Sequence, residues 1–158
     1  MTAKELIAIQ IERAVTDLFR SAKAMPEDRL NAKSAESCRS PLELLQECAQ
    51  SLKWAPMLLK SDGPPNFDPE AFEKARQERA QWTTIDACEE AARKILAETL
   101  DYIENYPESD LDRMIALPFM PDLKLSVAEI LASPYWNLTY HLGQINFIQT
   151  TYGDMEMH

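Results

Sequence analysis

The sequence predicts an all-α protein, folded as one four-helix bundle over residues 1–158. In several long stretches, apolar residues recur every three or four positions, which is the spacing of one buried helix face. Only three glycines occur in the chain, so a sheet with many tight turns is disfavoured. The length of 158 residues, with 46% hydrophobic and 27% charged residues, fits a single domain with its own core.

Capping and stopping residues define the expected helices. A Ser or Thr followed by Glu three residues later is a capping-box pattern, and it opens the first and the last long helix. A proline follows the first and the third helix. Pro56 and Pro134 lie inside the second and the last pattern, where proline is expected to kink the helix or to end it and start a fresh one. The long helices are therefore predicted at residues 2–24, from residue 40 onward, at 84–106 and at 126–152.

Two further segments connect these helices. A turn rich in proline is expected at residues 61–66, and the charged stretch that follows, at 68–80, predicts a short extra helix at the periphery. Residues 111–126 show no helical period. They are expected to form a long connection before the last helix, as two short extended pieces that run the length of the bundle.

Charge and composition disfavour several classes of partner. The net charge of −10 leaves no basic cluster for phosphate groups, so neither nucleic acid nor an anionic membrane surface is expected to bind. No apolar run approaches the ~20 residues of a membrane-spanning helix, and no signal-peptide pattern is visible. The three cysteines form no C-x-x-C pair and fit free thiols. A soluble cytoplasmic protein is expected.

The sequence does not identify catalytic residues. His141 and His158 are the two histidines, and the chain contains no nucleophile elbow, no glycine-rich phosphate loop and no H-E-x-x-H motif. His141 shares a helix face with Leu138 and Ile145. Its side chain is therefore predicted to point into the bundle.

One stretch of the last helix resembles a known family signature. Residues 137–145, N-L-T-Y-H-L-G-Q-I, are similar to the pattern H-x-x-x-H-x-G-Q-I of the DinB/YfiT-like metalloenzymes. Residues 40–47, S-P-L-E-L-L-Q-E, resemble the second-helix opening S-P-x-E-L-L-x-H of that family, and 117–119 with 125–131 resemble its entry to the last helix. The resemblance covers most of the chain. It implies a DinB-like four-helix bundle with a metal site of three histidines.

Carried over position by position, the three metal ligands fall on Glu47, Asn137 and His141. Two positions four residues apart lie on one helix face, where both can reach one cation. A carboxylate such as Glu47 is an accepted ligand, whereas the neutral amide of Asn137 is a poor one for zinc or iron. The resemblance thus implies a degraded metal site, with either no cofactor or a divalent metal, zinc or nickel.

Each of these residues also has a purely structural interpretation. Glu47 projects away from the centre of the apolar stripe of its helix, so it is a ligand or a solvated surface carboxylate. Cys48 lies closer to the buried side, as a small buried side chain or as a substitute thiolate ligand. His141 is a ligand or a core histidine that is hydrogen-bonded to neighbours such as Asn137 or Tyr140.

Two functions remain open. The favoured one is a non-catalytic bundle that kept the scaffold without the metal and that binds a small apolar ligand or acts through self-association. The alternative, which the resemblance implies, is a divalent-metal-dependent thiol transferase or isomerase, in which the metal activates a small-molecule thiol. A homodimer is also expected, because the long connection carries more apolar side chains than a surface segment normally exposes, and these either cap the bundle's own core or rest against a partner. These side chains are Met114, Ile115, Leu117, Phe119 and Met120.

Overall fold

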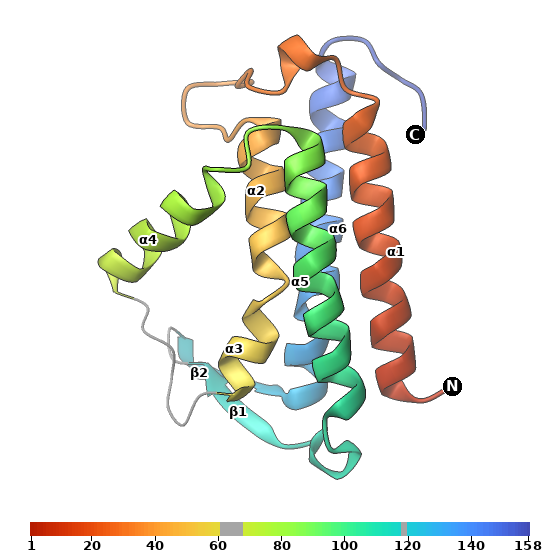
Figure 1. Ribbon diagram of the computed structural model, residues 1–158, viewed down its shortest axis with the longest axis vertical. Helices are drawn as coiled ribbons and strands as arrows, with labels where there is room; N and C mark the ends of the chain where they lie inside the picture. Colours follow the sequence, from red (N-terminus) through yellow and green to blue (C-terminus); the bar gives the residue numbers. More distant parts are fainter. Residues whose placement is uncertain (61–67, 118–119) are drawn as a thin grey trace.

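The computed structural model describes residues 1–60, 68–117 and 120–158, and long helices dominate it (Figure 1). The predicted all-α bundle is confirmed, with one small hairpin added. The helices are α1 (Ala3–Lys23), α2 (Pro41–Ser51), α3 (Trp54–Lys60), α4 (Pro69–Arg79), α5 (Ile85–Asn105) and α6 (Val127–Thr151), and the strands are β1 (Met114–Leu117) and β2 (Met120–Ser126).

The four long helices pack in a ring, in the order α1, α5, α2, α6. Helix α1 packs against α5 and α6, and α2 packs against the same two helices. Helices α1 and α6 run one way along the bundle, and α2 and α5 run the other way (Figure 1). Because α2 and α5 run in the same direction, the chain must return between them. Helix α4 makes this return on the outside of the bundle (Figure 1).

The helix ends lie close to the predicted positions because side-chain caps define them. Thr2, Ser40 and Ser126 each form a capping box with the glutamate three residues later. Asp68 and Thr84 each accept a hydrogen bond from the backbone N–H three residues on, at the starts of α4 and α5. The predicted bounds of α1, α4 and α5 are confirmed to within one residue.

The second predicted helix ends early, as its internal proline suggested. Helix α2 ends at Ser51 and α3 begins at Trp54, two residues before Pro56. The break is supported from the opposite side of the core, because the buried Thr99 hydroxyl of α5 donates a 3.0 Å hydrogen bond to the carbonyl oxygen of Leu52. A buried carbonyl at a helix end needs such a partner.

The last helix, in contrast, continues through its proline. Pro134 lies inside α6, so the fresh helix start that was expected there is wrong. Proline has no N–H to donate to the carbonyl four residues earlier, which belongs to Ile130. The hydroxyl of Ser133 donates a 2.7 Å hydrogen bond to that carbonyl instead. This substitution explains why the helix tolerates the proline.

The connection between α5 and α6 is a hairpin at one end of the bundle (Figure 1). Strands β1 and β2 pair antiparallel, with Met114 opposite Ser126 and Leu117 opposite Met120. The two expected extended pieces are confirmed, but their expected run along the length of the bundle is wrong, because the two strands pair and satisfy each other's backbone groups. Met114 and Met120 are exposed, whereas Leu117 is buried. The turn expected at 61–66 and the side chain of Phe119 lie outside the described residues.

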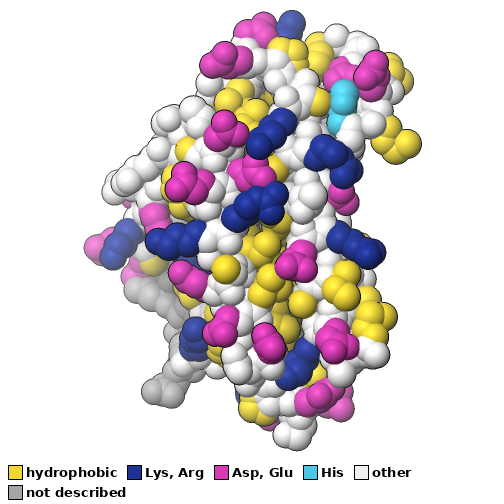
Figure 2. All heavy atoms as spheres, turned by 45° about the vertical axis from the view of Figure 1, so that its right-hand side comes forward, with side chains coloured by type: hydrophobic (Ala, Val, Ile, Leu, Met, Phe, Trp, Pro, Cys, Tyr) yellow, Lys and Arg dark blue, Asp and Glu magenta, His cyan; other side chains and the backbone are white. Residues whose placement is uncertain are grey.

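The core lies between the four long helical segments. Figure 2, turned to bring the α1 side forward, shows acidic and basic side chains interspersed over one face of the molecule. In the part of the chain that the structure describes, no helix is long and apolar enough to cross a membrane. The largest fully buried side chains are Phe19, Ile11, Leu18, Leu45, Leu52, Ile103, Ile130, Leu131, Leu138, Ile145, Val15 and Val127.

The contact between Thr99 and the α2–α3 break yields a stability prediction. Thr99→Val removes the hydroxyl and leaves the Leu52 carbonyl buried without its partner. The free energy of unfolding should fall by about 1–3 kcal/mol in urea denaturation. Thr16→Val is the matched control, since Thr16 lies on the exposed face of α1. An equal effect of both substitutions would contradict the role given to Thr99.

Candidate functional site

Glu47, Asn137 and His141 meet where α2 packs against α6. The two helices are antiparallel neighbours, so a residue of α2 faces successive turns of α6. The Nε2 atom of His141 lies 2.7 Å from the Oε2 atom of Glu47. The side-chain amide of Asn137 donates a 3.3 Å hydrogen bond to the Oε1 atom of Glu47. The structure thus brings together the three positions that the family resemblance singles out.

His141 points into the bundle, as predicted, with only 2% of its surface exposed. Its second ring nitrogen, Nδ1, lies 2.6 Å from the Oε1 atom of Gln144, one turn further along α6. The ring of Tyr140 meets the imidazole edge-on, with 5.2 Å between the ring centroids. The expected hydrogen bonds to Asn137 or Tyr140 are therefore wrong, because Glu47 and Gln144 occupy the two ring nitrogens.

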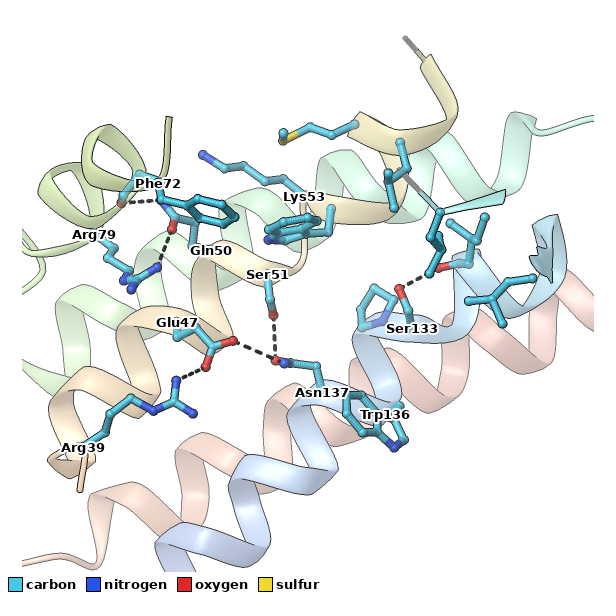
Figure 3. Close-up of a pocket in the computed structure, with 18 residues that line it drawn as sticks. Arg39, Glu47, Gln50, Ser51, Lys53, Phe72, Arg79, Ser133, Trp136 and Asn137 are labelled. Carbon is cyan, nitrogen blue, oxygen red and sulfur yellow. Dashed lines mark hydrogen bonds and ion pairs between the residues drawn. The ribbon is translucent and has the colours of Figure 1, made fainter. Parts of the chain in front are cut away.

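Asn137 connects two residues of α2 to each other. Its Nδ2 group donates to Glu47, and its Oδ1 atom accepts a 2.9 Å hydrogen bond from the hydroxyl of Ser51 (Figure 3). Ser51 lies one helical turn after Glu47, so both face the same amide. One amide side chain thus acts as a donor to Glu47 and as an acceptor from Ser51 at the same time.

Arg39, which lies in the segment before α2, also contacts Glu47. It precedes the Ser40 cap of α2, and its guanidinium lies 2.5 Å from the Oε2 atom of Glu47 (Figure 3). Sequence reasoning missed both Arg39 and Gln144. Gln144 could have been found from its spacing of three residues after His141. The position of Arg39 depends on the path of the loop before α2, for which the sequence carries no comparable signal.

These partners decide the charge of Glu47, whose side chain is 24% exposed. Burial raises the pKa of its carboxyl, but the hydrogen bonds and charges of His141 and Arg39 outweigh burial and lower the pKa from 4.5 to about 2. Glu47 is therefore a carboxylate at neutral pH. The interpretation of Glu47 as a solvated surface carboxylate is wrong, because its two oxygens are bound within the protein.

Cys48 is not suited to be a thiolate ligand. Its side chain is fully buried, and burial raises the pKa of the thiol well above 9.0. Burial also raises the pKa of the nearby Cys88 thiol to about 12. Both cysteines are free and protonated at neutral pH. The structure supports the interpretation of Cys48 as a small buried side chain.

The donor set does not fit a divalent metal ion. A metal ligand must direct a lone pair at the ion, but here Nε2 of His141 faces Oε2 of Glu47, and the carboxylate contacts His141, Arg39 and Asn137. The positively charged guanidinium of Arg39 also contacts the carboxylate of Glu47, which a metal cation would need as its ligand. Among residues 1–60, 68–117 and 120–158, no three His, Cys, Asp or Glu side chains are grouped so that they could hold a metal.

A pocket of about 550 Å³ opens beside this group of side chains (Figure 3). Residues of α2, α3, α4, α6 and the hairpin line it. Its apolar wall consists of Trp54, Met57, Leu58, Phe72, Ala75, Leu117, Leu125, Ile130, Pro134 and Trp136, and its polar wall of Arg39, Glu47, Gln50, Ser51, Lys53, Arg79, Ser133 and Asn137.

The three cations of the pocket differ in how they are neutralised. Arg39 is paired with Glu47, and Lys53 with Glu78 at 2.9 Å. Arg79 donates a 3.1 Å hydrogen bond to the neutral amide of Gln50. Within the residues that the structure describes, Arg79 forms no ion pair. It is therefore the cation of this pocket that remains available to an anion.

Comparison with known proteins identifies the fold. No family model matches the chain, and no curated protein matches it. A solved structure, YfiT from Bacillus subtilis, has a TM-score of 0.75 at 12% identity over 95% of this chain and 87% of YfiT. That protein is described as "a probable metal-dependent hydrolase with an unusual four-helix bundle topology".

Two further solved structures are similar. An uncharacterised protein from Clostridium difficile 630 has a TM-score of 0.68 at 12% identity, over 93% of this chain and 95% of that protein. A protein from Streptococcus pneumoniae has a TM-score of 0.61 at 14% identity, over 94% and 92%. At this level of identity the similarity concerns the fold. The chain has the DinB-like four-helix bundle fold of YfiT, as the sequence resemblance implied.

The low pKa of Glu47 predicts how stability depends on pH. Because the folded pKa lies below the unfolded value near 4.5, the stabilisation is complete above pH 4.5 and is lost as pH falls toward 2. From pH 6 to pH 3, the wild type should lose about 2 kcal/mol more than Glu47→Gln in urea denaturation. Glu98→Gln, on the exposed face of α5, is the control and should follow the wild type. Parallel curves for wild type and Glu47→Gln would rule out this assignment.

Proposed function

We propose that this protein is a non-catalytic DinB-like bundle that binds a small ligand in the pocket between α2, α4 and α6 without a metal ion. The ligand has an apolar body and one anionic group. The observation that carries the proposal is the internal pairing of Glu47 with His141 and Arg39, which takes the place of metal coordination.

Charge balance supports the absence of a metal from this site. A largely covered carboxylate needs positive charge and hydrogen-bond donors, since an unpaired buried charge costs several kcal/mol. Arg39 supplies the positive charge and a donor, His141 makes a further contact with the carboxylate, and the amide of Asn137 supplies a further donor. A divalent ion would have to displace Arg39 from Glu47 and break the contact with His141. This exchange leaves the guanidinium without its partner, so metal binding is disfavoured.

The lining of the pocket supports the ligand class. Its volume lies in the range of small-molecule sites, which is about 300–1,000 Å³. Trp54, Phe72 and Trp136 provide aromatic surface for an apolar body. The guanidinium of Arg79 offers several N–H donors in a planar fork that matches a carboxylate. In a chain of net charge −10, a pocket with three cations and one carboxylate stands apart from the average surface.

The alternative function, a divalent-metal-dependent thiol transferase or isomerase, finds no support in this donor set. That chemistry requires a cation that lowers the pKa of the bound thiol. His141 and Glu47 bind each other, and Asn137 is a poor ligand for such ions. YfiT is described as metal-dependent, but the identity of 12% does not carry its ligands to this chain.

Metal titration tests the absence of a metal site. Untagged protein with His158→Ala, which removes the terminal histidine as a competing ligand, should bind zinc and nickel equally weakly before and after the further change His141→Ala. Restoring the family pattern with Glu47→His and Asn137→His should raise zinc affinity by about tenfold or more in isothermal titration calorimetry. Arg39→Ala in this background should raise it further, because the competing cation is gone. Stoichiometric zinc in the wild type that is lost on His141→Ala would overturn the proposal.

Ligand binding can be followed by the fluorescence of Trp54 and Trp136, which line the pocket. Decanoate should bind more tightly than decanol, because Arg79 attracts the carboxylate. Arg79→Gln should weaken decanoate binding by about tenfold and leave decanol unchanged. Arg76→Gln is the matched control, since Arg76 lies on α4, pairs with Glu73 and does not line the pocket.

Each outcome of this experiment is informative. Equal binding of decanoate and decanol would disprove the selection for an anion. The absence of binding by either probe would disprove the assignment of the pocket to apolar ligands. Circular dichroism of both arginine variants verifies that the bundle is intact.

A further inference from the structure

The outer face of α6 carries an uncharged aromatic stripe. Trp136, Tyr140 and Phe147 are 65%, 53% and 68% exposed, and their spacing, with Gly143 between them, puts them on one face of the helix. From Ile130 to Thr151 the helix contains no Asp, Glu, Lys or Arg, although 27% of the chain is charged. A contiguous exposed apolar surface of this kind marks an interaction site.

Gly143 lies at the centre of this stripe, although nothing within its own chain requires a glycine at this position. Glycine in the middle of a helix is unfavourable compared with alanine. The backbone of Gly143 does not need glycine, since its φ is not positive. A Cβ atom at Gly143 would meet no atom within 4 Å, so no neighbour in the chain excludes a side chain there. The remaining explanation is that another molecule approaches the backbone of α6 closely at Gly143, which the missing side chain permits.

A groove of about 530 Å³ borders the same glycine. Tyr140, Gly143, Phe147 and Ile148 of α6 form one wall. Leu44 of α2 and the segment before that helix form the other wall. The groove lies directly beside the aromatic side chains of the stripe, so one surface offers both a hollow and bulky side chains that could enter the same hollow on a second copy.

We propose that α6 packs antiparallel across α6 of a second copy of this chain, with the two-fold axis at Gly143. At a rise of about 1.5 Å per residue, Phe147 lies about 6 Å from Gly143 on one side and Tyr140 about 4.5 Å on the other. An antiparallel crossing at Gly143 therefore sets Phe147 of each copy against Tyr140 of the other. Such reciprocal contacts are what a two-fold interface requires.

The charge of the molecule favours a second copy over other partners. A net charge of −10 makes two copies repel each other, unless they meet through an uncharged surface. Acidic and basic side chains cover the face of the molecule in Figure 2, whereas the outer face of α6 has none between residues 130 and 151. A charged partner, such as nucleic acid or a basic peptide, would find no counter-charge on this stripe.

The hairpin is a weaker candidate for the interface than the sequence suggested. Leu117 is buried and lines the pocket, so it serves the protein's own interior. Exposed Met114 and Met120 share the hairpin with the exposed charges of Asp122 and Lys124. The two interfaces can be separated by substitution, because Met114 and Phe147 lie on different elements and are both exposed.

Analytical ultracentrifugation over a wide range of concentration tests the proposal. The wild type should sediment as a species of twice the 18.0 kDa chain mass. Phe147→Glu should give monomer, because it places a carboxylate without a counter-charge against Tyr140 of the other copy. Met114→Glu is the matched control and should remain dimeric. Unchanged circular dichroism excludes unfolding as the cause of dissociation.

Gly143→Ala gives a second test, because it should stabilise the monomer and weaken the dimer. The added methyl group has free space in the monomer and improves helix propensity, so the melting temperature of dilute monomer should rise by about 2–4 °C. The same methyl group separates the two crossing helices, so the dimer dissociation constant should rise by about tenfold or more. A merely structural glycine would not weaken the dimer.

Three results would overturn the proposal. They are a wild type at monomer mass at every concentration, a dimer that Met114→Glu dissociates and Phe147→Glu does not, and a dimer whose dissociation constant is unchanged by Gly143→Ala. Trp136 belongs to both the stripe and the pocket, so the ligand titrations with the Arg79 variants are compared at one fixed protein concentration.

Discussion

Between α2 and α6, a carboxylate lies largely covered by protein, and the surrounding side chains must neutralise it. The oxygens of Glu47 receive His141 and Arg39 on one side and the amide of Asn137 on the other. The loss of any partner from such a group costs more than the pair contributes, because the remaining charge stays buried. These residues therefore depend on one another, and their contacts fix the relative position of the two helices.

The order of the helices makes this contact possible. Glu47 can face α6 only because α2 and α6 are antiparallel neighbours, although about 75 residues separate the two helices in sequence. The return through α4 and the hairpin after α5 produce this arrangement. The same return sets α4 over the pocket, so that Arg79 and Phe72 form part of its wall (Figure 3). The fold thus determines both the closed charge network and the pocket beside it.

Sequence reasoning succeeded where the signal is local. Capping residues such as Thr2 and Thr84 gave helix bounds, and the face shared with Leu138 and Ile145 gave the burial of His141. It failed where the outcome depends on distant partners. The position of Arg39 requires the three-dimensional path of the chain, whereas the rescue of Pro134 by Ser133 is a contact within one helical turn, a local signal that sequence reasoning missed. The family pattern identified Glu47, Asn137 and His141, but it could not reveal that they bind one another.

The pairing of α1 with α6 has a consequence for synthesis in the cell. Helix α1 buries Ile11, Val15 and Leu18 in a core that α6 helps to form, yet about 100 residues separate the two helices. A ribosome adds roughly 5–20 residues per second, so the apolar face of α1 waits for several seconds before its partner exists. During that interval the part of this apolar face that α6 will cover stays exposed, and exposed apolar surface makes an incomplete chain prone to aggregation. The topology thus makes the completion of this bundle a late, concerted event that follows the emergence of α6.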